Sequence, residues 1–436
     1  MILYTDFARD YDLSKRKGYY MSKNIRLFSF AVSLIMIVCC FTSCLFGAAQ
    51  KSDYLSKGEV QQMINNSMHG NITVEGGDNY NVTIDSANQD NVAAGKALLS
   101  VVSIDCIFKT VGGYGTQKEK SSSGSGVIYK IDKNRGDAYI ITNYHVVYYN
   151  ASNTENKISD DITLYLYGQE STEYAIPASY VGGSMNYDIA VLKVSGSRVL
   201  AQSNAMAAEF ADSNMVAVLD KAIAIGNPEN LGISATLGYV NVDSEYIRME
   251  GADGSTEIQL RVMRMDTAVN SGNSGGGLFD NEGRLIGIVN AKLTSSENMS
   301  YAIPSNFVKY VADNILFYCD NQTRENVYRC YLGIVVSPEK LYTEYDKNNG
   351  KVIKREVVSI TSLNDDSIVK DALEIGDVIN SITIDGVKYD VTRMFVVTDA
   401  MLNARAGSSV VINITRGGNT FDVSINVTEN SITKIV

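Results

Sequence analysis

A serine in a glycine-rich loop is the clearest candidate for covalent chemistry in this sequence. Ser274 lies in the segment Asn270-Ser-Gly-Asn-Ser-Gly-Gly-Gly-Leu278. A serine hydroxyl is a weak nucleophile and needs a base that removes its proton during attack. The tetrahedral intermediate of acyl transfer also needs preorganised hydrogen-bond donors, and glycines allow backbone N–H groups to turn towards a substrate carbonyl. Taken alone, the segment is equally typical of a flexible loop or of a phosphate cradle, although no lysine or helix start follows it.

The chain has only two histidines that could act as this base. His69 lies in the polar segment Ser67-Met-His-Gly70 and is interpreted as a solvated residue. His145 ends the hydrophobic strand predicted in Ile141-Thr-Asn-Tyr-His-Val-Val147, a place where a lone histidine is usually structural. Asp188, in Asn186-Tyr-Asp-Ile-Ala-Val-Leu-Lys193, stands at the start of a very apolar strand, where an aspartate is usually a turn residue or a cap.

Together the three residues predict a catalytic triad with Ser274 as nucleophile, His145 as base and Asp188 as the group that orients the imidazole. An aspartate beside an apolar strand costs desolvation free energy unless a hydrogen bond compensates it, and a bond to His145 would do so. The chain order His, Asp, Ser is that of chymotrypsin-like double barrels, in which one barrel supplies His and Asp and the other supplies the nucleophile.

The surrounding sequence favours many short strands. Segments rich in β-branched and aromatic residues recur from Leu98 to about Pro304, and turn residues separate them. They cover Ser100–Phe108, Gly126–Ile131, Ala138–Val147, Thr163–Tyr167, Ile189–Val194, Ala222–Ile225, Leu278–Phe279 and Leu285–Val289. Ser305 is then a predicted N-cap of a helix whose apolar residues fall on one face. This pattern predicts a mainly β fold, either a double barrel or a sandwich, that ends in a helix.

A second unit of about 100 residues is predicted from Tyr328 onwards. Its predicted strands are Gly333–Val336, Val357–Ile360, Val378–Ile384, Val410–Thr415 and Val423–Val427. Between them, Asp390–Arg405 is predicted to be a helix closed by Gly407. Strands combined with one or two helices predict a small separate α/β domain.

The N-terminus is predicted to attach the chain to a membrane. Residues 27–49 carry no charge and are long enough to cross a bilayer, and the basic residues Lys15, Arg16, Lys17, Lys23 and Arg26 lie before them. The positive-inside rule then predicts that residues 1–26 are cytoplasmic and that the rest lies outside. The segment is either a signal anchor or a lipoprotein signal with lipid on Cys44, and translation starts at Met1 or Met21. Residues 50–92 are polar and predict a stalk.

Composition excludes several functional classes. The formal net charge of −11 and the absence of a basic stripe argue against nucleic acid as a partner. No paired CxxC pattern indicates a metal site, and no motif indicates a cofactor. Cys319 and Cys330 either form a disulfide or remain buried thiols.

The chain resembles the HtrA (DegP- and DegS-like) family of trypsin-like serine proteases, over about residues 92–430. The segments that carry the resemblance are Gly124-Ser-Gly-Val-Ile128, Thr142-Asn-Tyr-His-Val146, Asp188-Ile-Ala-Val-Leu192, Ala224-Ile-Gly-Asn-Pro228, Asp266-Thr-Ala268, Gly272-Asn-Ser-Gly-Gly276 and Tyr301-Ala-Ile-Pro-Ser305. The resemblance implies a chymotrypsin/trypsin-like double β-barrel at residues 93–320, followed by a PDZ domain at residues 328–430. Ser271 and Gly277 stand where the family commonly has proline, which concerns the stiffness of the nucleophile loop.

The resemblance also implies roles for further residues. An oxyanion hole would use the backbone N–H groups of Gly272, Asn273 and Ser274. The S1 pocket and the substrate strand would comprise Ala268, Val289, Asn290 and Ala291. Ala268 predicts a preference for small to medium apolar P1 residues, because it cannot pair a basic side chain, and this selectivity is expected to be loose.

The PDZ carboxylate loop would comprise Tyr331, Leu332, Gly333 and Ile334, and peptide C-termini would add as a strand beside the predicted helix.

The resulting hypothesis is an extracytoplasmic serine endoprotease that cleaves misfolded or regulatory envelope proteins and is regulated by peptide C-termini. Its partners would be unfolded polypeptides, peptide C-termini and a membrane, and the resemblance implies a homotrimer. The alternative is a catalytically silent PDZ scaffold or chaperone-like binding protein. The triad favours the enzyme, since a scaffold has no need of His145.

Overall fold

The computed structural model describes residues 71–75, 81–85, 89–111, 116–290, 299–319, 326–347 and 350–435. The chain divides into two compact units, Met1–Ile84 and Asp85–Val436. The predicted membrane segment, Cys44, His69 and most of the predicted stalk lie outside the described residues. In the first unit, β1 (Asn71–Glu75) and β2 (Asn81–Asp85) form a two-stranded sheet. Among the described residues, none of the helices has the length and apolar composition needed to cross a membrane.

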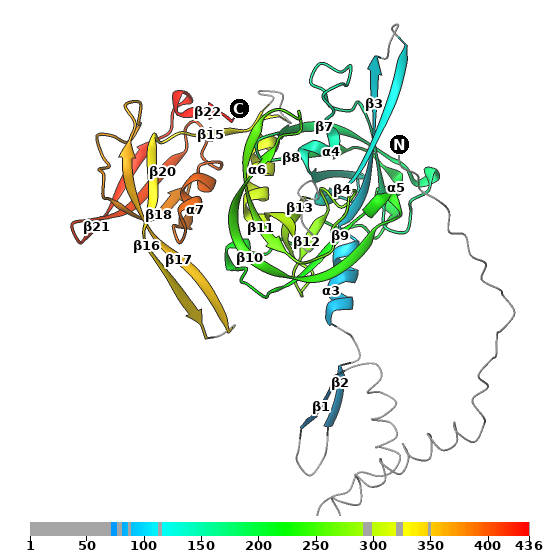
Figure 1. The fold of residues 1–436 in the computed structure, drawn as a ribbon, viewed down its shortest axis with the longest axis horizontal. Coiled ribbons are helices and arrows are strands. Elements are labelled where there is room, and N and C mark those ends of the chain that lie inside the picture. The colour runs from blue at the N-terminus through cyan, green and yellow to red at the C-terminus, as the bar shows by residue number, and fades with distance from the viewer. Residues whose placement is uncertain are drawn as a thin grey trace, which may run out of the picture. The chain divides into compact units, whose positions relative to one another are not determined.

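The second unit begins with a helix and a closed six-stranded barrel (Figure 1). The helix α3 covers Gln89–Leu98. The strands of this first barrel are β3 (Val101–Val111), β4 (Gln117–Asp132), β5 (Asp137–Thr142), β6 (Asp161–Leu166), β7 (Ile176–Ser184) and β8 (Ile189–Val194). They pair antiparallel in the order β3-β4-β5-β8-β7-β6. Their inward aliphatic residues, such as Ile104, Ile128 and Leu164, fill one buried cluster, which is why alternating short strands close here into a barrel.

A second closed barrel follows, with strand order β10-β11-β14-β13-β12-β9. Its strands are β9 (Lys221–Gly226), β10 (Ser234–Glu250), β11 (Glu257–Met265), β12 (Gly277–Phe279), β13 (Leu285–Asn290) and β14 (Ser300–Pro304). A hairpin turn around Asp280–Gly283 joins β12 to β13. The two barrels confirm the predicted double-barrel fold and exclude the sandwich.

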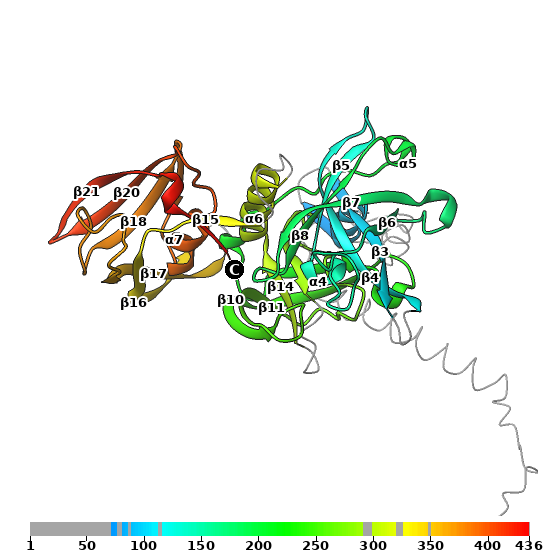
Figure 2. The same ribbon diagram turned by 90° about the horizontal axis from the view of Figure 1, so that it is seen from above.

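Short helical turns connect the strands of the barrels. They are α4 (Tyr144–Val147), η2 (Thr172–Tyr174), α5 (Arg198–Gln202), η3 (Ser213–Met215) and η4 (Pro228–Asn230). The predicted terminal helix is α6 (Ser305–Tyr318), and its buried residues include Phe307, Val308, Val311 and Ile315. Its N-cap is Pro304, so the predicted N-cap role of Ser305 is wrong. The Ser305 hydroxyl instead donates to the carbonyl oxygen of Ala211 at 3.0 Å. The helix packs on strands β7, β8, β13 and β14 and so ties the two barrels together (Figure 2).

The C-terminal domain, residues 326–435, is built on a five-stranded path in the order β16-β17-β18-β20-β21. These strands are β16 (Ile334–Asp346), β17 (Lys351–Leu363), β18 (Val378–Ile384), β20 (Ser409–Arg416) and β21 (Asn419–Asn426). The strand β19 (Val387–Asp390) pairs with β18. The strands β15 (Tyr328–Cys330) and β22 (Ile432–Lys434), with η6 (Glu429–Ser431) between β21 and β22, pair with each other, so the domain continues beyond the predicted end at residue 430.

The helix predicted at Asp390–Arg405 is shorter in the structure, where α7 covers Met394–Ala400. Its first predicted residue, Asp390, belongs to β19 because the Asp385-Gly386 turn, with positive φ at both residues, folds β19 back on β18. At the other end the Arg405 side chain donates to the carbonyl oxygens of Leu402 and Ala404 in a non-helical segment. Periodicity alone therefore extended the predicted helix into a strand and a turn.

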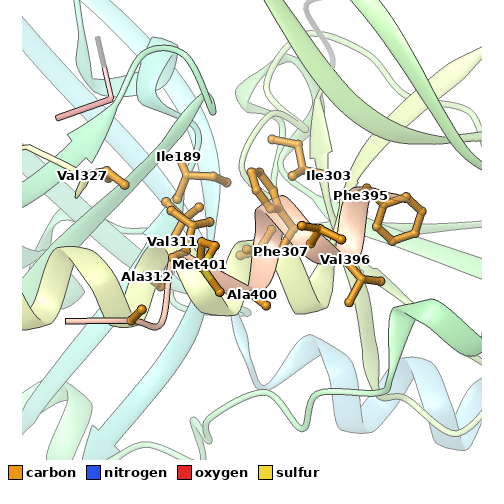
Figure 3. Close-up of a cluster of buried hydrophobic side chains, with 14 of the residues drawn as sticks. Ile189, Ile303, Phe307, Val311, Ala312, Val327, Phe395, Val396, Ala400 and Met401 are labelled. Atoms are coloured by element: carbon orange, nitrogen blue, oxygen red, sulfur yellow. The ribbon is translucent and has the colours of Figure 1, made fainter. Parts of the chain in front are cut away.

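The helices α6 and α7 share one buried cluster, to which Phe307, Val311, Phe395, Val396 and Ala400 contribute (Figure 3). Beside this cluster, Arg261 on β11 forms a buried ion pair with Asp399 on α7.

More exposed ion pairs also connect the C-terminal domain with the second barrel. Lys351 pairs with Asp220, and both Lys354 and Arg393 pair with Asp243. These pairs place their cations on the C-terminal domain and their carboxylates on the second barrel.

Candidate active site

The first barrel delivers His145 at the end of a buried strand. β5 ends at Thr142, and the next residues turn into α4, a single helical turn anchored by buried Val146 and Val147. His145 therefore lies in this turn and not at the end of a strand as predicted. The turn is held to the neighbouring strand because the Asn143 side-chain amide donates to the Asp188 carbonyl oxygen at 2.9 Å.

Asp188 is almost fully buried and is enclosed by hydrogen-bond donors. Its Oδ1 accepts the His145 backbone N–H at 3.0 Å, and its Oδ2 lies 2.8 Å from His145 Nδ1. The Asn290 side-chain amide donates to the same Oδ2 at 2.8 Å. The carboxylate side chain is 4% exposed, so these bonds compensate its desolvation. With Nδ1 turned towards Asp188, the imidazole has Nε2 on its far side for proton transfer.

Asp188 also has an unusual backbone. Its φ is 50°, in the left-handed region, and its N–H donates to the Met185 carbonyl oxygen at 3.2 Å. An aspartate tolerates this region better than most residues, and the turn points its side chain back towards His145. The strained conformation lies directly before the apolar strand β8.

Ser274 comes from the second barrel and lies against the first. Its carbonyl oxygen accepts the Ser125 N–H of β4 at 2.8 Å. The next residue, Gly275, has φ of 83°, and a Cβ there would lie 2.1 Å from the Ser125 carbonyl oxygen and 2.2 Å from Thr142 Oγ1. Only glycine allows this approach, which packs the nucleophile loop against the segment that leads into α4. The structure thus brings the loop of Ser274 to the boundary between the two barrels, where His145 and Asp188 lie. This boundary is the seam that contains the candidate active site.

The Gly124-Ser-Gly126 segment has a role at the same seam. A Cβ at Gly124 would lie 2.7 Å from Val146 Cγ1 and 3.2 Å from the Ser274 carbonyl oxygen. The Ser125 hydroxyl donates to the Gly272 carbonyl oxygen at 2.7 Å. This strand therefore supports both catalytic loops.

The nucleophile loop begins with a tight turn that changes the predicted oxyanion hole. The Asn273 N–H donates to the Asn270 carbonyl oxygen at 3.0 Å, and Gly272 has φ of 97°. A positive φ at the third residue of a four-residue turn is typical of a type II turn. The Asn273 N–H is therefore used within the turn, so its predicted role as an oxyanion donor is wrong. The roles of Gly272 and Ser274 stay predictions.

The residues predicted for S1 and the substrate strand lie in different environments. Ala268 is exposed, and its carbonyl oxygen accepts the Thr236 hydroxyl at 3.0 Å. Val289 is buried, and its N–H and carbonyl oxygen are paired with Gly276 and Gly275. Its backbone therefore supports the nucleophile loop and does not form a substrate strand. Ala291 lies outside the described residues.

Asn290 is the site residue whose role the sequence missed. It was predicted to contact substrate, but its side-chain amide donates a hydrogen bond to Asp188, and Asn290 is only 1% exposed. A polar side chain at the end of the buried strand β13 was the available signal, because such a residue needs a hydrogen-bond partner.

The predicted carboxylate loop of the C-terminal domain precedes the edge strand β16. The Tyr331 N–H donates to the Ser431 carbonyl oxygen at 2.8 Å, so it does not serve as a carboxylate donor as predicted. Gly333 has φ of 72°, and a Cβ there would lie 2.5 Å from Ser367 Cα. Leu332 is buried, and Ile334 begins β16.

The remaining chemistry-bearing residues are structural. Cys106, Cys319 and Cys330 are buried thiols, and no disulfide connects Cys319 with Cys330 among the described residues. Burial raises the pKa of Cys330 to about 11 and that of Cys106 to about 12. Over the described ranges, no group of His, Cys, Asp and Glu has the arrangement of a metal site.

Comparison with known proteins agrees with this geometry. Residues 124–288 match the trypsin-like peptidase domain. Over 204 residues the chain is 36% identical to the serine protease Do-like HtrA of Lactococcus lactis subsp. lactis, covering 45% of each chain. It is 30% identical over 329 residues to the periplasmic serine endoprotease DegP of Salmonella typhimurium, covering 74% of this chain and 61% of that protein. The HtrA-type protease AlgW with tripeptide shares 24% identity at a TM-score of 0.47, covering 78% of this chain and 96% of that chain.

The double barrel thus has a trypsin-like fold and is similar over residues 124–288 to the trypsin-like peptidase domain. The chain is similar to HtrA and DegP serine proteases, and it spans about half the length of the HtrA relative that it matches at 36% identity.

Proposed function

We propose that this protein is a serine endopeptidase. The observation that carries the proposal is the His145–Asp188 pair, with the imidazole held at Nδ1 and the loop of Ser274 packed against the same seam. Ser274 Oγ attacks the scissile carbonyl while His145 takes its proton, and Asp188 stabilises the imidazolium that forms. The backbone N–H groups of Gly272 and Ser274 stabilise the negative oxygen of the intermediate.

Extended or unfolded polypeptides are the proposed substrates, since attack on an internal peptide bond requires a chain that can enter the seam between the barrels. The small side chain of Ala268 supports a preference for small to medium apolar P1 residues. Misfolded or regulatory envelope proteins are the proposed physiological class.

The C-terminal domain is proposed to act as a PDZ domain that binds peptide C-termini and so regulates proteolysis. Support comes from β16, which is an edge strand of its sheet, and from α7, which contacts β16. An edge strand beside a helix can accept a peptide as an added strand. The Gly333 turn leads into this strand and allows a close approach of the backbone.

The uncharged residues 27–49 and the basic residues before them support a membrane tether, with both domains outside the cytoplasm. The tether is either a signal anchor or lipid on Cys44. The proposed homotrimer rests on the family resemblance, and light scattering of the purified protein tests it.

The deciding experiment incubates residues 51–436 and the matched Ser274→Ala variant with casein. The wild type is expected to cleave casein, and Ser274→Ala is expected to lose roughly 10⁴–10⁶ in kcat while keeping its fold by circular dichroism. Equal cleavage by both would contradict the triad. If neither cleaves, even with peptides that carry free apolar C-termini, the result would identify a binding scaffold in place of an enzyme.

A further inference from the structure

Two hydrogen bonds from outside the nucleophile loop fix the peptide planes on either side of Gly272. The Glu229 N–H donates to the Ser271 carbonyl oxygen at 2.8 Å, and the Ser125 hydroxyl donates to the Gly272 carbonyl oxygen at 2.7 Å. In a trans peptide the C=O and N–H groups point in opposite directions. The Gly272 N–H therefore points away from Glu229. Rotating this peptide by half a turn would break the bond to Glu229 and withdraw the donor from the oxyanion hole.

The turn that presents the Glu229 N–H is strained. Glu229 has φ of 54° and Asn230 has φ of 58°, two consecutive residues other than glycine in the left-handed region. Left-handed backbone is unfavourable for residues that carry a Cβ. Strained backbone of this kind persists only where the surrounding structure imposes it, and it concentrates at functional sites. Something outside Glu229 must therefore hold the turn.

Asn227 is the residue that imposes this conformation. It is 2% exposed, and its side-chain amide donates to Ser103 Oγ at 2.7 Å and to Asn230 Oδ1 at 2.8 Å. Its Oδ1 accepts the Gly232 N–H at 2.8 Å, and its own N–H donates to Ser125 Oγ at 2.8 Å. One buried side chain thus connects both ends of the turn to the first barrel.

The turn and the nucleophile loop are in direct contact. A Cβ at Gly272 would lie 2.2 Å from the Asn227 carbonyl oxygen and 3.0 Å from the Glu229 nitrogen. Ser271 occupies the second position of the type II turn, where proline would fix φ from within the loop. This chain has serine and not proline at position 271, so the orientation of the Ser271–Gly272 peptide depends on hydrogen bonds from the neighbouring turn.

We propose that Asn227 is a positioning residue for the oxyanion hole. It holds the turn Asn227–Asn230, whose Glu229 N–H keeps the Gly272 N–H facing the substrate carbonyl. This role rests on the proposed peptidase function, because the oriented N–H acts only when a tetrahedral intermediate forms.

Steady-state hydrolysis of a chromogenic peptide by the same purified chain tests the role. Asn227→Ala is expected to lower kcat by about 10²–10³, the effect of losing one oxyanion donor, with KM changed by no more than about twofold. A peptide aldehyde, whose hemiacetal oxygen needs the same donors, should bind more weakly by a similar factor. Binding of uncleaved peptide to the Ser274→Ala and Asn227→Ala/Ser274→Ala proteins should differ little.

Two further comparisons separate positioning from general loss of structure. Glu229→Gly keeps the N–H and suits a positive φ, whereas Glu229→Pro removes the N–H, so their kcat values should differ by about 10²-fold. Adding Ser271→Pro to Asn227→Ala should recover at least about tenfold in kcat, because the ring presets the turn from within. Leu231→Ala, at a side chain 82% exposed on the same segment, is the matched control and should keep wild-type kcat.

The inference is overturned if the wild type is active and Asn227→Ala keeps its kcat. It is also overturned if the Gly and Pro variants at 229 are equally active, or if Ser271→Pro fails to rescue a folded Asn227→Ala protein. An inactive wild type would contradict the proposed function itself, and the positioning role with it.

Discussion

Removing Asp399 should destabilise the protein more than removing both members of its ion pair. The Arg261 and Asp399 side chains are 4% and 9% exposed, and Nη2 lies 2.5 Å from Oδ2. The guanidinium lies 4.0 Å from the ring centroid of Phe395 and 5.4 Å from that of Phe307. Because arginine does not lose its proton, Asp399→Ala leaves a buried charge without its partner, at a cost of about 3–5 kcal/mol.

The loss of stability caused by the reciprocal substitution, Arg261→Met, is expected to depend on pH. Burial raises the pKa of Asp399, and the Arg261 charge opposes that rise. Arg261→Met removes the opposing charge, so the folded pKa rises further above the unfolded pKa. The folded state then binds more protons than the unfolded state, and the free energy of unfolding falls as pH rises. Arg261→Met should therefore cost little near about pH 4 and progressively more towards the folded pKa. The cost of Asp399→Ala should instead fall as pH rises, because the wild type loses stability as Asp399 ionises and the variant has no such group.

Urea unfolding followed by far-ultraviolet circular dichroism measures these differences, since the chain has no tryptophan for fluorescence. The double variant Arg261→Met/Asp399→Leu should unfold within about 1 kcal/mol of the wild type or be more stable, because apolar residues can replace a buried pair. A cost of less than about 0.5 kcal/mol for Asp399→Ala would refute the reasoning. So would the same pH dependence in both single variants.

Three other substitutions probe the site and the edge strand. Asn290→Ala removes a charge-assisted bond to Asp188 worth about 1.5–3 kcal/mol, so kcat for a peptide should fall about 10- to 150-fold with little change in KM. Gly275→Ala forces a Cβ to 2.2 Å from Thr142 Oγ1 at a positive φ, so it should abolish hydrolysis and lower the melting temperature by several degrees. Normal activity of this variant would contradict the close packing of the Ser274 loop on Thr142. Gly333→Ala should weaken binding of a fluorescent peptide C-terminus at least about tenfold while hydrolysis of a short peptide continues, and unchanged affinity would contradict the proposed groove.

The sequence predicted the triad residues because each combines a polar group with an apolar context. His145, Asp188 and Ser274 stand beside buried strands or in a glycine-rich loop, where chemistry explains an otherwise costly position. Their hydrogen-bond partners were harder to predict. The bond of Asn290 to Asp188 and that of Asn227 to Ser103 join residues far apart in the chain, and strand pairing alone brings them together.

The predicted boundaries of helices and strands were wrong where backbone geometry outweighs the pattern of side chains. The segment of His145 has the composition of a strand, yet it turns into α4 because Asn143 bonds to the Asp188 carbonyl oxygen. The helical pattern of Asp390–Arg405 was interrupted by pairing of β19 with β18. The Asn273 N–H was assigned to the oxyanion hole although the turn from Asn270 uses it, a distinction that depends on a single dihedral angle.

The ion pairs between the second barrel and the C-terminal domain make this contact directional. Asp220 and Asp243 receive cations from the C-terminal domain, whereas the buried pair of Arg261 with Asp399 has the opposite polarity. If the C-terminal domain bound the second barrel in the reverse orientation, Asp399 would face like charge and Arg261 would have no anion as a partner. The contact thus accepts one relative orientation and rejects its inverse. Exchanging the signs on both sides of the contact together should preserve the fit, whereas reversing the signs on one side alone should destroy it.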